Sequence, residues 1–154
     1  MKSITILLVL LTCLVGAAVC FAADVQVGAW KLNEAKSKLS PGQPKNNTVV
    51  YQADGDNMKV IVDGTDSEGK PAHNEWTGKF DGKDYPVTGD PTSDARSYKR
   101  VNDRTLTLTL KKGGKTTASG RISVAADGKS RTVTTSGTDS KGKKFKGTAV
   151  YDKQ

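Results

Sequence analysis

Thr105-Leu106-Thr107-Leu108-Thr109-Leu110 alternates a polar and an apolar residue over six positions. Successive side chains of a β-strand point to opposite faces, so a strand here would place three leucines on one face and three threonines on the other. A helix would distribute the leucines around its axis instead. The stretch therefore predicts a half-buried strand, with one face against a core and the other toward solvent.

The same alternation recurs on both sides of this stretch. It places Met58, Val60 and Val62 on one face of an earlier segment, and Ile122 and Val124 on one face of a later segment. Asp-Gly, Asn-Asp and Gly-Gly pairs separate such runs, and they favour the tight turns of hairpins. We predict about ten strands, over residues 25–33, 47–54, 57–63, 71–80, 83–88, 95–102, 104–112, 115–125, 130–137 and 143–151.

Short connections between consecutive strands require that neighbours run antiparallel. No segment has a convincing helical stripe, and residues 40–47, which contain Pro41 and Pro44, form the one long connection. Ten strands in a flat sheet would expose long edges, which closure removes. The predicted fold is all-β, an antiparallel up-and-down meander of about ten strands closed into a small barrel. A two-sheet β-sandwich is the alternative.

The first 23 residues have the layout of a secretory signal peptide. Lys2 provides a positive charge, an apolar run extends from residue 4 to residue 19, and Ala22-Ala23 ends it with small residues. The run is too short to favour a membrane-spanning helix. We therefore predict a signal peptide over residues 1–23 and a single lipocalin-like barrel domain over residues 24–154. The expected location is secreted or periplasmic, with no transmembrane segment after removal of the signal.

Both cysteines, Cys13 and Cys20, lie within the predicted signal peptide, so the mature chain would fold without a disulfide. Residues 24–154 hold 23 Lys and Arg against 16 Asp and Glu. The positive surplus is spread over several short clusters, which solubility explains, and attraction to an anionic envelope surface is the sharper alternative. Export argues against a nucleic-acid partner, and we expect a monomer.

One heptapeptide occurs twice in nearly the same form. Residues 64–70 are Gly-Thr-Asp-Ser-Glu-Gly-Lys, and residues 137–143 are Gly-Thr-Asp-Ser-Lys-Gly-Lys. Equivalent hairpins in two halves of a barrel would explain this repeat, and so would repeated use of one favourable turn sequence. Both copies match the outline of a phosphate-binding loop, but no helix follows either of them. We interpret both as hairpin turns.

Gly28-Ala29-Trp30 on the first predicted strand resembles the G-x-W that opens lipocalins, fatty-acid-binding proteins and other calycin barrels. Residues 147–153 are similar to the last strand of fatty-acid-binding proteins, and residues 30–37 resemble a set of small exported bacterial proteins of undefined function. The resemblance implies a calycin-like barrel in which Trp30 closes one end and Gly28 allows a close backbone approach.

Two departures limit what the resemblance implies about a ligand. Residues 40–44, Ser-Pro-Gly-Gln-Pro, stand where fatty-acid-binding proteins have a helix-turn-helix lid, and they cannot form two helices. Ala149 occupies the position of the arginine that holds the fatty-acid carboxylate in that family, two residues before Tyr151. The ligand chemistry of the family therefore does not carry over to this chain.

Few residues of the mature chain suit catalysis. His73 is the single histidine, and alternation places it with Glu75 on the strand face opposite Trp76. We interpret His73 as a surface residue. We expect no enzymatic activity, no catalytic residues, no metal site and no cofactor.

Aromatic side chains on the apolar strand faces are the candidate ligand contacts. In a wide barrel they would line a cavity, and in a narrow barrel they would form the core. An inward Tyr98 would bring Arg96 and Arg100 with it and create an internal site for an anionic group, but the cost of burial favours an outward Tyr98. The candidate ligand-binding residues are Trp76, Phe80, Tyr98, Arg100, Phe145 and Tyr151.

These observations predict an exported, non-enzymatic binding protein for a small hydrophobic or amphipathic ligand, held inside the barrel. The alternative is a structural or interaction protein of the cell envelope, with a filled barrel and a basic surface.

Overall fold

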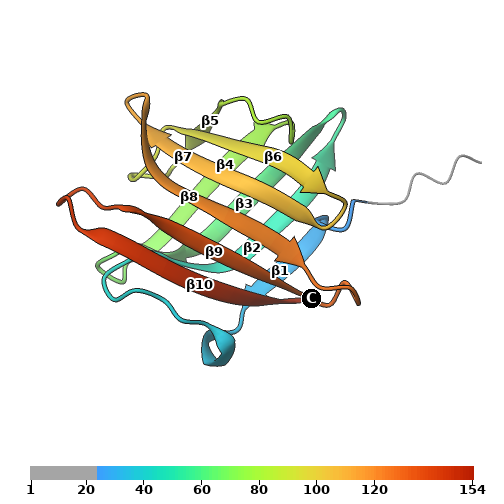
Figure 1. Cartoon of the computed structure of the whole chain (residues 1–154), viewed down its shortest axis with the longest axis horizontal. Helices are drawn as coiled ribbons and strands as arrows, with labels where there is room; N and C mark the ends of the chain where they lie inside the picture. The colour runs from blue at the N-terminus through green and yellow to red at the C-terminus, as the bar shows by residue number, and fades with distance from the viewer. Residues whose placement is uncertain (1–23) are drawn as a thin grey trace, which may run out of the picture.

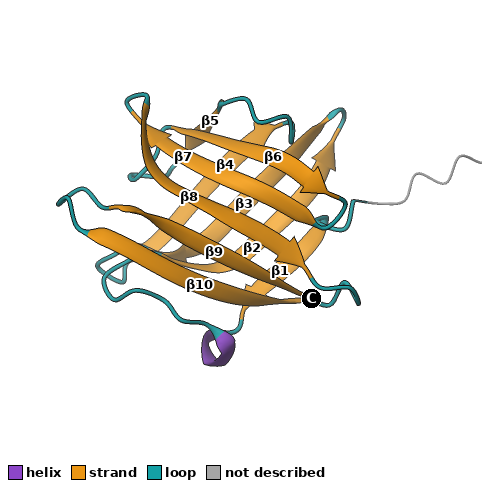
Figure 2. Ribbon diagram, viewed as in Figure 1, coloured by secondary structure: helices purple, strands orange, loops and turns teal. Residues whose placement is uncertain are grey.

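A computed structural model describes residues 24–154, and the predicted signal peptide lies outside the described residues. No helix among residues 24–154 has the length and apolar character needed to cross a membrane. Strands make up most of residues 24–154, which also contain one short 3-10 helix, η1, at Glu34–Lys36 (Figure 2). The strands are β1 (Gly28–Leu32), β2 (Lys45–Asp54), β3 (Asn57–Thr65), β4 (Pro71–Gly78), β5 (Tyr85–Thr88), β6 (Ala95–Asn102), β7 (Thr105–Lys112), β8 (Lys115–Val124), β9 (Ser130–Thr138) and β10 (Lys144–Lys153).

The strands follow one another around a closed barrel, each hydrogen-bonded to the next in the sequence (Figure 1). The pairings are antiparallel, and the ring closes where β1 pairs with β10, with Trp30 opposite Lys153 and Leu32 opposite Tyr151. The predicted all-β meander of ten strands closed into a barrel is confirmed, in place of the alternative sandwich.

The first strand begins three residues later than predicted, whereas the others keep within two residues of their predicted bounds. Residues 24–27 form a turn, in which the backbone N–H of Val27 donates to the carbonyl of Asp24 at 2.9 Å. This turn covers one end of the barrel. Gln26 is fully buried, and the indole N–H of Trp30 donates to its carbonyl at 2.8 Å.

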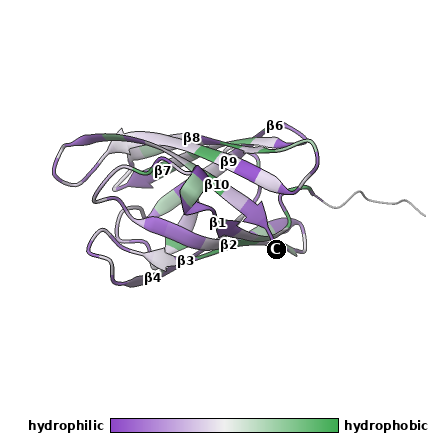
Figure 3. Ribbon diagram, turned by 90° about the horizontal axis from the view of Figure 1, so that it is seen from below, coloured by the Kyte–Doolittle hydropathy of each residue, from purple (hydrophilic) through white to green (hydrophobic). Residues whose placement is uncertain are grey.

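Apolar and polar segments alternate along the strands, as the changes of colour in Figure 3 show. The inward side chains meet inside the barrel, and the largest of those that are fully buried are Trp30, Trp76, Tyr51 and Leu106. They come from β1, β4, β2 and β7, which surround the barrel axis. The interior is therefore packed with side chains at this level of the barrel.

Residues 89–94, between β5 and β6, cover the opposite end of the barrel. They bury Asp90 against Arg96, whose Nη2 lies 3.1 Å from Oδ2 of Asp90, and the two side chains are 9% and 7% exposed. The Ser93 hydroxyl donates to the same oxygen at 2.5 Å. Burial alone would raise the pKa of Asp90, but hydrogen bonds from Ser93 and Thr92 and the charge of Arg96 lower it overall.

Candidate functional site

Four aromatic side chains meet near the end of the barrel that residues 24–27 cover. Trp76 of β4 and Tyr98 of β6 pack edge to face, with ring centroids 4.7 Å apart. Phe80, just after β4, stacks on Trp76 at 6.4 Å, and Tyr85 of β5 packs edge to face on Trp76 at 5.7 Å. Offset and edge-to-face arrangements at these distances are favourable. We refer to Trp76, Phe80, Tyr85 and Tyr98 as the aromatic cluster.

Gly78 leaves the space that the aromatic cluster occupies. A Cβ atom at this position would lie 2.5 Å from Cγ of Tyr85 and 2.7 Å from Cζ2 of Trp76. The indole N–H of Trp76 donates to the backbone carbonyl of Arg96 at 2.8 Å, so this buried polar group is satisfied. A side chain at residue 78 would therefore force apart two rings that are fixed from several directions.

Tyr98 faces the interior, so the outward orientation that burial cost favoured is wrong. The side chain is 3% exposed and belongs to the core, and Arg96 and Arg100 share its face of β6. The cost of placing two arginines on this face is offset because each one pairs with a carboxylate. Arg96 pairs with Asp90, and Arg100 forms an ion pair with Asp24.

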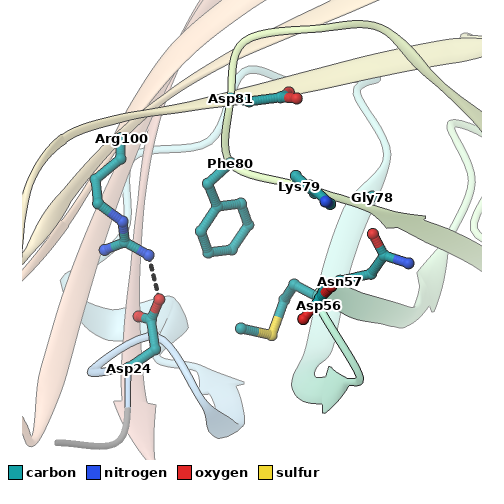
Figure 4. Close-up of a pocket in the computed structure, with 9 residues that line it drawn as sticks. Asp24, Asp56, Asn57, Gly78, Lys79, Phe80, Asp81 and Arg100 are labelled. Carbon is teal, nitrogen blue, oxygen red and sulfur yellow. Dashed lines mark hydrogen bonds and ion pairs between the residues drawn. The ribbon is translucent and has the colours of Figure 1, made fainter. Parts of the chain in front are cut away.

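A cleft of about 370 Å³ opens beside the aromatic cluster at this end of the barrel (Figure 4). The Phe80 ring lies beside the ion pair of Arg100 and Asp24 in this view. The guanidinium carbon of Arg100 is 5.2 Å from the Phe80 centroid, which is within cation–π range. The cleft is lined by Asp24, Asp56, Asn57, Met58, Gly78, Lys79, Phe80, Asp81 and Arg100.

Two carboxylates of the cleft already hold hydrogen bonds from the protein. Asp24 accepts the backbone N–H of Gln26 at 2.9 Å with one oxygen and binds Arg100 with the other. Asp81 accepts the backbone N–H of Lys83 at 3.0 Å and the hydroxyl of Tyr85 at 2.9 Å. The bond from the Lys83 amide contributes most to lowering the pKa of Asp81. These two carboxylates therefore stabilise the walls of the cleft.

The cations of the cleft differ in their pairing. Arg100 is 36% exposed although Asp24 binds one of its nitrogens. Lys79 is exposed and forms no salt bridge with any residue in the range 24–154. The cleft thus joins an apolar surface, from Phe80 and Met58, to two cationic groups that solvent reaches.

A second group of buried rings surrounds Arg131, and its Tyr51 ring lies 6.4 Å from that of Phe80 and 6.3 Å from that of Tyr98. The guanidinium carbon of Arg131 lies 4.9 Å from the Trp30 ring, 4.8 Å from the Tyr51 ring and 5.0 Å from the Tyr151 ring. Arg131 is 2% exposed, and its Nε and Nη1 have no hydrogen-bond partner among residues 24–154. Burial raises the pKa of Tyr151 to about 12 and also raises that of Tyr51, so both phenols stay neutral at physiological pH. Aromatic faces, and not a phenolate, stabilise this cation.

The six predicted ligand-binding residues do not form one site. Trp76, Phe80 and Tyr98 belong to the aromatic cluster, and Arg100 contacts it from the cleft. Tyr151 belongs to the group around Arg131. Phe145 is paired with Gly137 at the start of β10, toward the opposite end of the barrel. Phe80 and Arg100 are the two predicted residues that line the cleft.

Sequence reasoning missed Arg131, Tyr51 and Asp24. For the first two a signal was available, because Arg131 shares its strand face with Val133 and Tyr51 shares its face with Val49. A charged residue on an otherwise apolar face is worth noticing. Asp24 had no such signal, since its ion pair joins positions 76 residues apart and depends on the turn at residues 24–27.

Gly28 and Trp30 meet Lys153 where the barrel closes. Gly28 has a φ of 128°, and a Cβ atom there would lie 2.8 Å from Cε of Lys153. The ammonium of Lys153 is 5.0 Å from the Trp30 ring, on which Arg131 also packs. Glycine is therefore needed at residue 28 for its backbone conformation, whereas the end of the flexible Lys153 side chain could move to admit a Cβ atom.

His73 lies on the outer wall, where its side chain is 54% exposed. Its Nδ1 is 2.6 Å from Oδ1 of Asp63 and its Nε2 is 3.3 Å from Oε1 of Glu75. These hydrogen bonds, that to Asp63 first, raise the pKa of His73. Within residues 24–154 no group of three or more His, Cys, Asp and Glu side chains is arranged to hold a metal ion.

No protein family model matches this chain, and no curated protein matches it. Among solved structures it is similar to EF1p2_mFAP2b bound to DFHBI, at 14% identity and a TM-score of 0.49, over 86% of this chain and 97% of that one. It is also similar to the redesigned beta barrel mFAP1 bound to DFHBI, at 20% identity and a TM-score of 0.46, over 84% and 95% of the two chains. The redesigned beta barrel b11L5F_LGL matches at 18% identity and a TM-score of 0.48, over 88% and 97%. At these values the likeness says nothing about a ligand of this chain.

Proposed function

We propose that residues 24–154 act as an exported, non-enzymatic binding protein for a small amphipathic molecule that carries an anionic group. The observation that carries the proposal is the cleft beside the aromatic cluster, where Arg100 flanks the Phe80 ring. The apolar part of the ligand packs on Phe80 and Met58, and its anionic group binds Arg100 and Lys79. An apolar surface with a few well-placed polar groups is the usual composition of a small-molecule site.

Asp24 competes with the ligand for Arg100. It binds one guanidinium nitrogen, while the planar guanidinium has five N–H donors and is partly exposed to the cleft. A ligand anion either displaces the Asp24 carboxylate or binds the donors that it leaves free. The turn at residues 24–27 therefore regulates the affinity of the site by how firmly it holds Asp24.

Two parts of this proposal, export and a non-enzymatic role, are supported mainly by the sequence. The layout of residues 1–23 supports secretion or a periplasmic location, and residues 24–154 contain no cysteine. The single histidine lies on the outer wall, beside Asp63 and Glu75, and does not line the cleft. The protein as proposed holds its ligand without transforming it.

Titration with 8-anilinonaphthalene-1-sulfonate, an anionic aromatic probe, tests this function. We expect the probe to bind with enhanced fluorescence, and Phe80→Ser and Arg100→Gln each to weaken its binding at least about tenfold. Asp24→Asn should strengthen binding of the anionic probe and leave that of neutral N-phenyl-1-naphthylamine unchanged.

Two variants outside the cleft provide matched controls. Val101→Ser removes an apolar side chain that is 50% exposed, and Arg104→Gln removes a positive charge from the same end of the barrel. Both should bind the probe as the parent protein does. Loss of binding in the controls equal to that in Phe80→Ser and Arg100→Gln would contradict the proposal, as would absence of probe binding by the parent.

A further inference from the structure

The net positive charge of the described chain is gathered on one side of the barrel. Residues 24–104 hold twelve Lys and Arg against thirteen Asp and Glu, whereas residues 105–154 hold eleven against three. The second group comprises β7, β8, β9 and β10, which are consecutive neighbours in the sheet and run from yellow-orange to red in Figure 1. We refer to these four strands as the β7–β10 wall. Apart from Arg131, which points into the barrel, these cations lie on β7, β8 and β10 and on the turns between the strands.

The three carboxylates of this region lie in its turns and near the end of β10, outside the two rows that hold Arg121 and Lys146. Asp127 and Asp139 lie in turns, where they accept backbone N–H groups at 2.9 to 3.0 Å. Asp152, near the end of β10, accepts the side-chain amide of Asn33 at 2.7 Å. The strands β7, β8 and β9 contain no carboxylate.

Hydroxyl side chains surround two cations on the outer face of this wall. A groove of about 360 Å³ runs over the face, between the rows that hold Arg121 and Lys146. Both cations are exposed, and neither forms a salt bridge with a residue of the described part of the chain. The strand register aligns Thr107, Arg121, Thr134 and Thr148 in one row, and Thr109, Ser119, Ser136 and Lys146 in the next.

We propose that the β7–β10 wall binds an acidic polysaccharide, a polymer whose sugars bear carboxylate or sulfate groups. The planar guanidinium of Arg121 matches the two oxygens of such a group, and Lys146 supplies a second positive charge. Threonine and serine hydroxyls both donate and accept hydrogen bonds, as the hydroxyls of a sugar do. The face therefore matches the polymer in its charges and in its hydroxyl groups.

The chemistry of the face separates this partner from other polyanions. The aromatic residues of β10, Phe145 and Tyr151, share the inward face, so the outer face offers no ring on which a nucleic-acid base could stack. Within residues 24–154 the exposed large hydrophobic side chain is Val101, on β6, so the wall has no side chain to insert into a lipid surface. This site lies outside the cleft, and the inference does not depend on the function proposed there.

Calorimetric titration of the purified protein with alginate, a carboxylated polysaccharide, tests the inference. We expect binding at low salt that weakens as salt rises, and no binding of neutral dextran. The double variant Arg121→Ser/Lys146→Ser should bind alginate at least about tenfold more weakly. Lys70→Ser/Lys83→Ser removes the same charge from turns away from the wall, so it should change the affinity less than about twofold.

Nuclear magnetic resonance locates the contact without any substitution. Alginate should shift the amide signals of β7–β10 more than those of β2–β4 in the parent protein. Equal losses in the two double variants, absence of alginate binding, or shifts centred on another wall would overturn the proposal. So would binding of single-stranded DNA or of anionic phosphatidylglycerol vesicles as tightly as alginate through Arg121 and Lys146. Failure of the function proposed for the cleft can be distinguished from failure of this inference, because Phe80→Ser should bind alginate as the parent protein does.

Discussion

Trp30 is fully buried, with Arg131 and Lys153 both within cation–π distance of its ring and its N–H donated to the Gln26 carbonyl. Trp30→Ala would empty this space and remove one of the three rings around Arg131. The expected loss of unfolding free energy is about 3–5 kcal/mol, the usual range for a buried aromatic site. Denaturant unfolding measures the loss, and Trp30→Phe, which keeps a ring but not the N–H, should lose less. An unchanged unfolding midpoint in Trp30→Ala would contradict this role.

His73 should make stability depend on pH near neutrality. Because its pKa is raised in the folded protein, the stabilisation from Asp63 and Glu75 is fully present below the unfolded pKa of about 6.5, and it is lost as pH rises through the folded value. Asp63→Asn should lower the pKa of His73, which a titration of the ring proton signals by nuclear magnetic resonance measures. Asp56→Asn, in a separate turn, is the control. The same His73 pKa in parent and Asp63→Asn would rule out the contact.

Among the connections between strands, residues 89–94 depend on one buried ion pair. Asp90→Ala would leave the charge of Arg96 buried without its carboxylate, which costs about 3–5 kcal/mol in comparable cases. Thermal or denaturant unfolding measures this loss. The double variant Asp90→Ala/Arg96→Met should recover part of it, because it removes the unpaired charge as well. A double variant no more stable than Asp90→Ala would contradict the explanation.

The same ion pair makes the stability of the folded protein depend on pH in the acid range. Since the pKa of Asp90 is lowered in the folded protein, its stabilisation is present above the unfolded value of about 3.9 and is lost as pH falls through the folded value. The Asp90→Ala variant should lack this part of the acid dependence.

The repeated heptapeptide forms two turns with the same hydrogen bonds. Asp66 accepts the backbone N–H groups two and four residues later at 2.8 and 2.9 Å, and Asp139 does so at 2.9 Å for both. One turn joins β3 to β4 and the other joins β9 to β10, so the interpretation as hairpin turns is confirmed. In each copy, the aspartate carboxylate accepts its hydrogen bonds from the backbone of its own turn.

The alternation of polar and apolar residues was enough to predict the strands, because it shows which face of each strand is buried on folding. It gave the strands and the inward positions of Trp76 and Phe80. Alternation could not decide whether Tyr98 points inward. The cost of burying the two arginines on the same face depends on their pairing with Asp90 and Asp24, which come from other segments of the chain. The cleft escaped prediction for the same reason: its walls meet only when the barrel closes.

Closure of the barrel determines whether the protein can associate with another chain through its strand edges. Each strand is hydrogen-bonded on both sides, so the closed ring presents no free edge for another chain. We expect a monomer, measured by sedimentation equilibrium. Truncation after Thr138 removes β10 and exposes the edges of β1 and β9, and this variant should aggregate. A stable dimer of the full barrel, or a monomeric truncated chain, would contradict this view.

The seam between β1 and β10 also sets the order of events during folding. Its contacts join the two ends of the described chain, with Trp30 opposite Lys153, so their loop-closure entropy must be overcome before any stabilisation is gained. Chains dominated by such distant pairings fold slowly, on the order of milliseconds to seconds. The barrel cannot close before β10 is available, and until then Trp30 and its partner Arg131 lack part of their enclosure. A newly made chain therefore stays open at this seam until β10 has been synthesised.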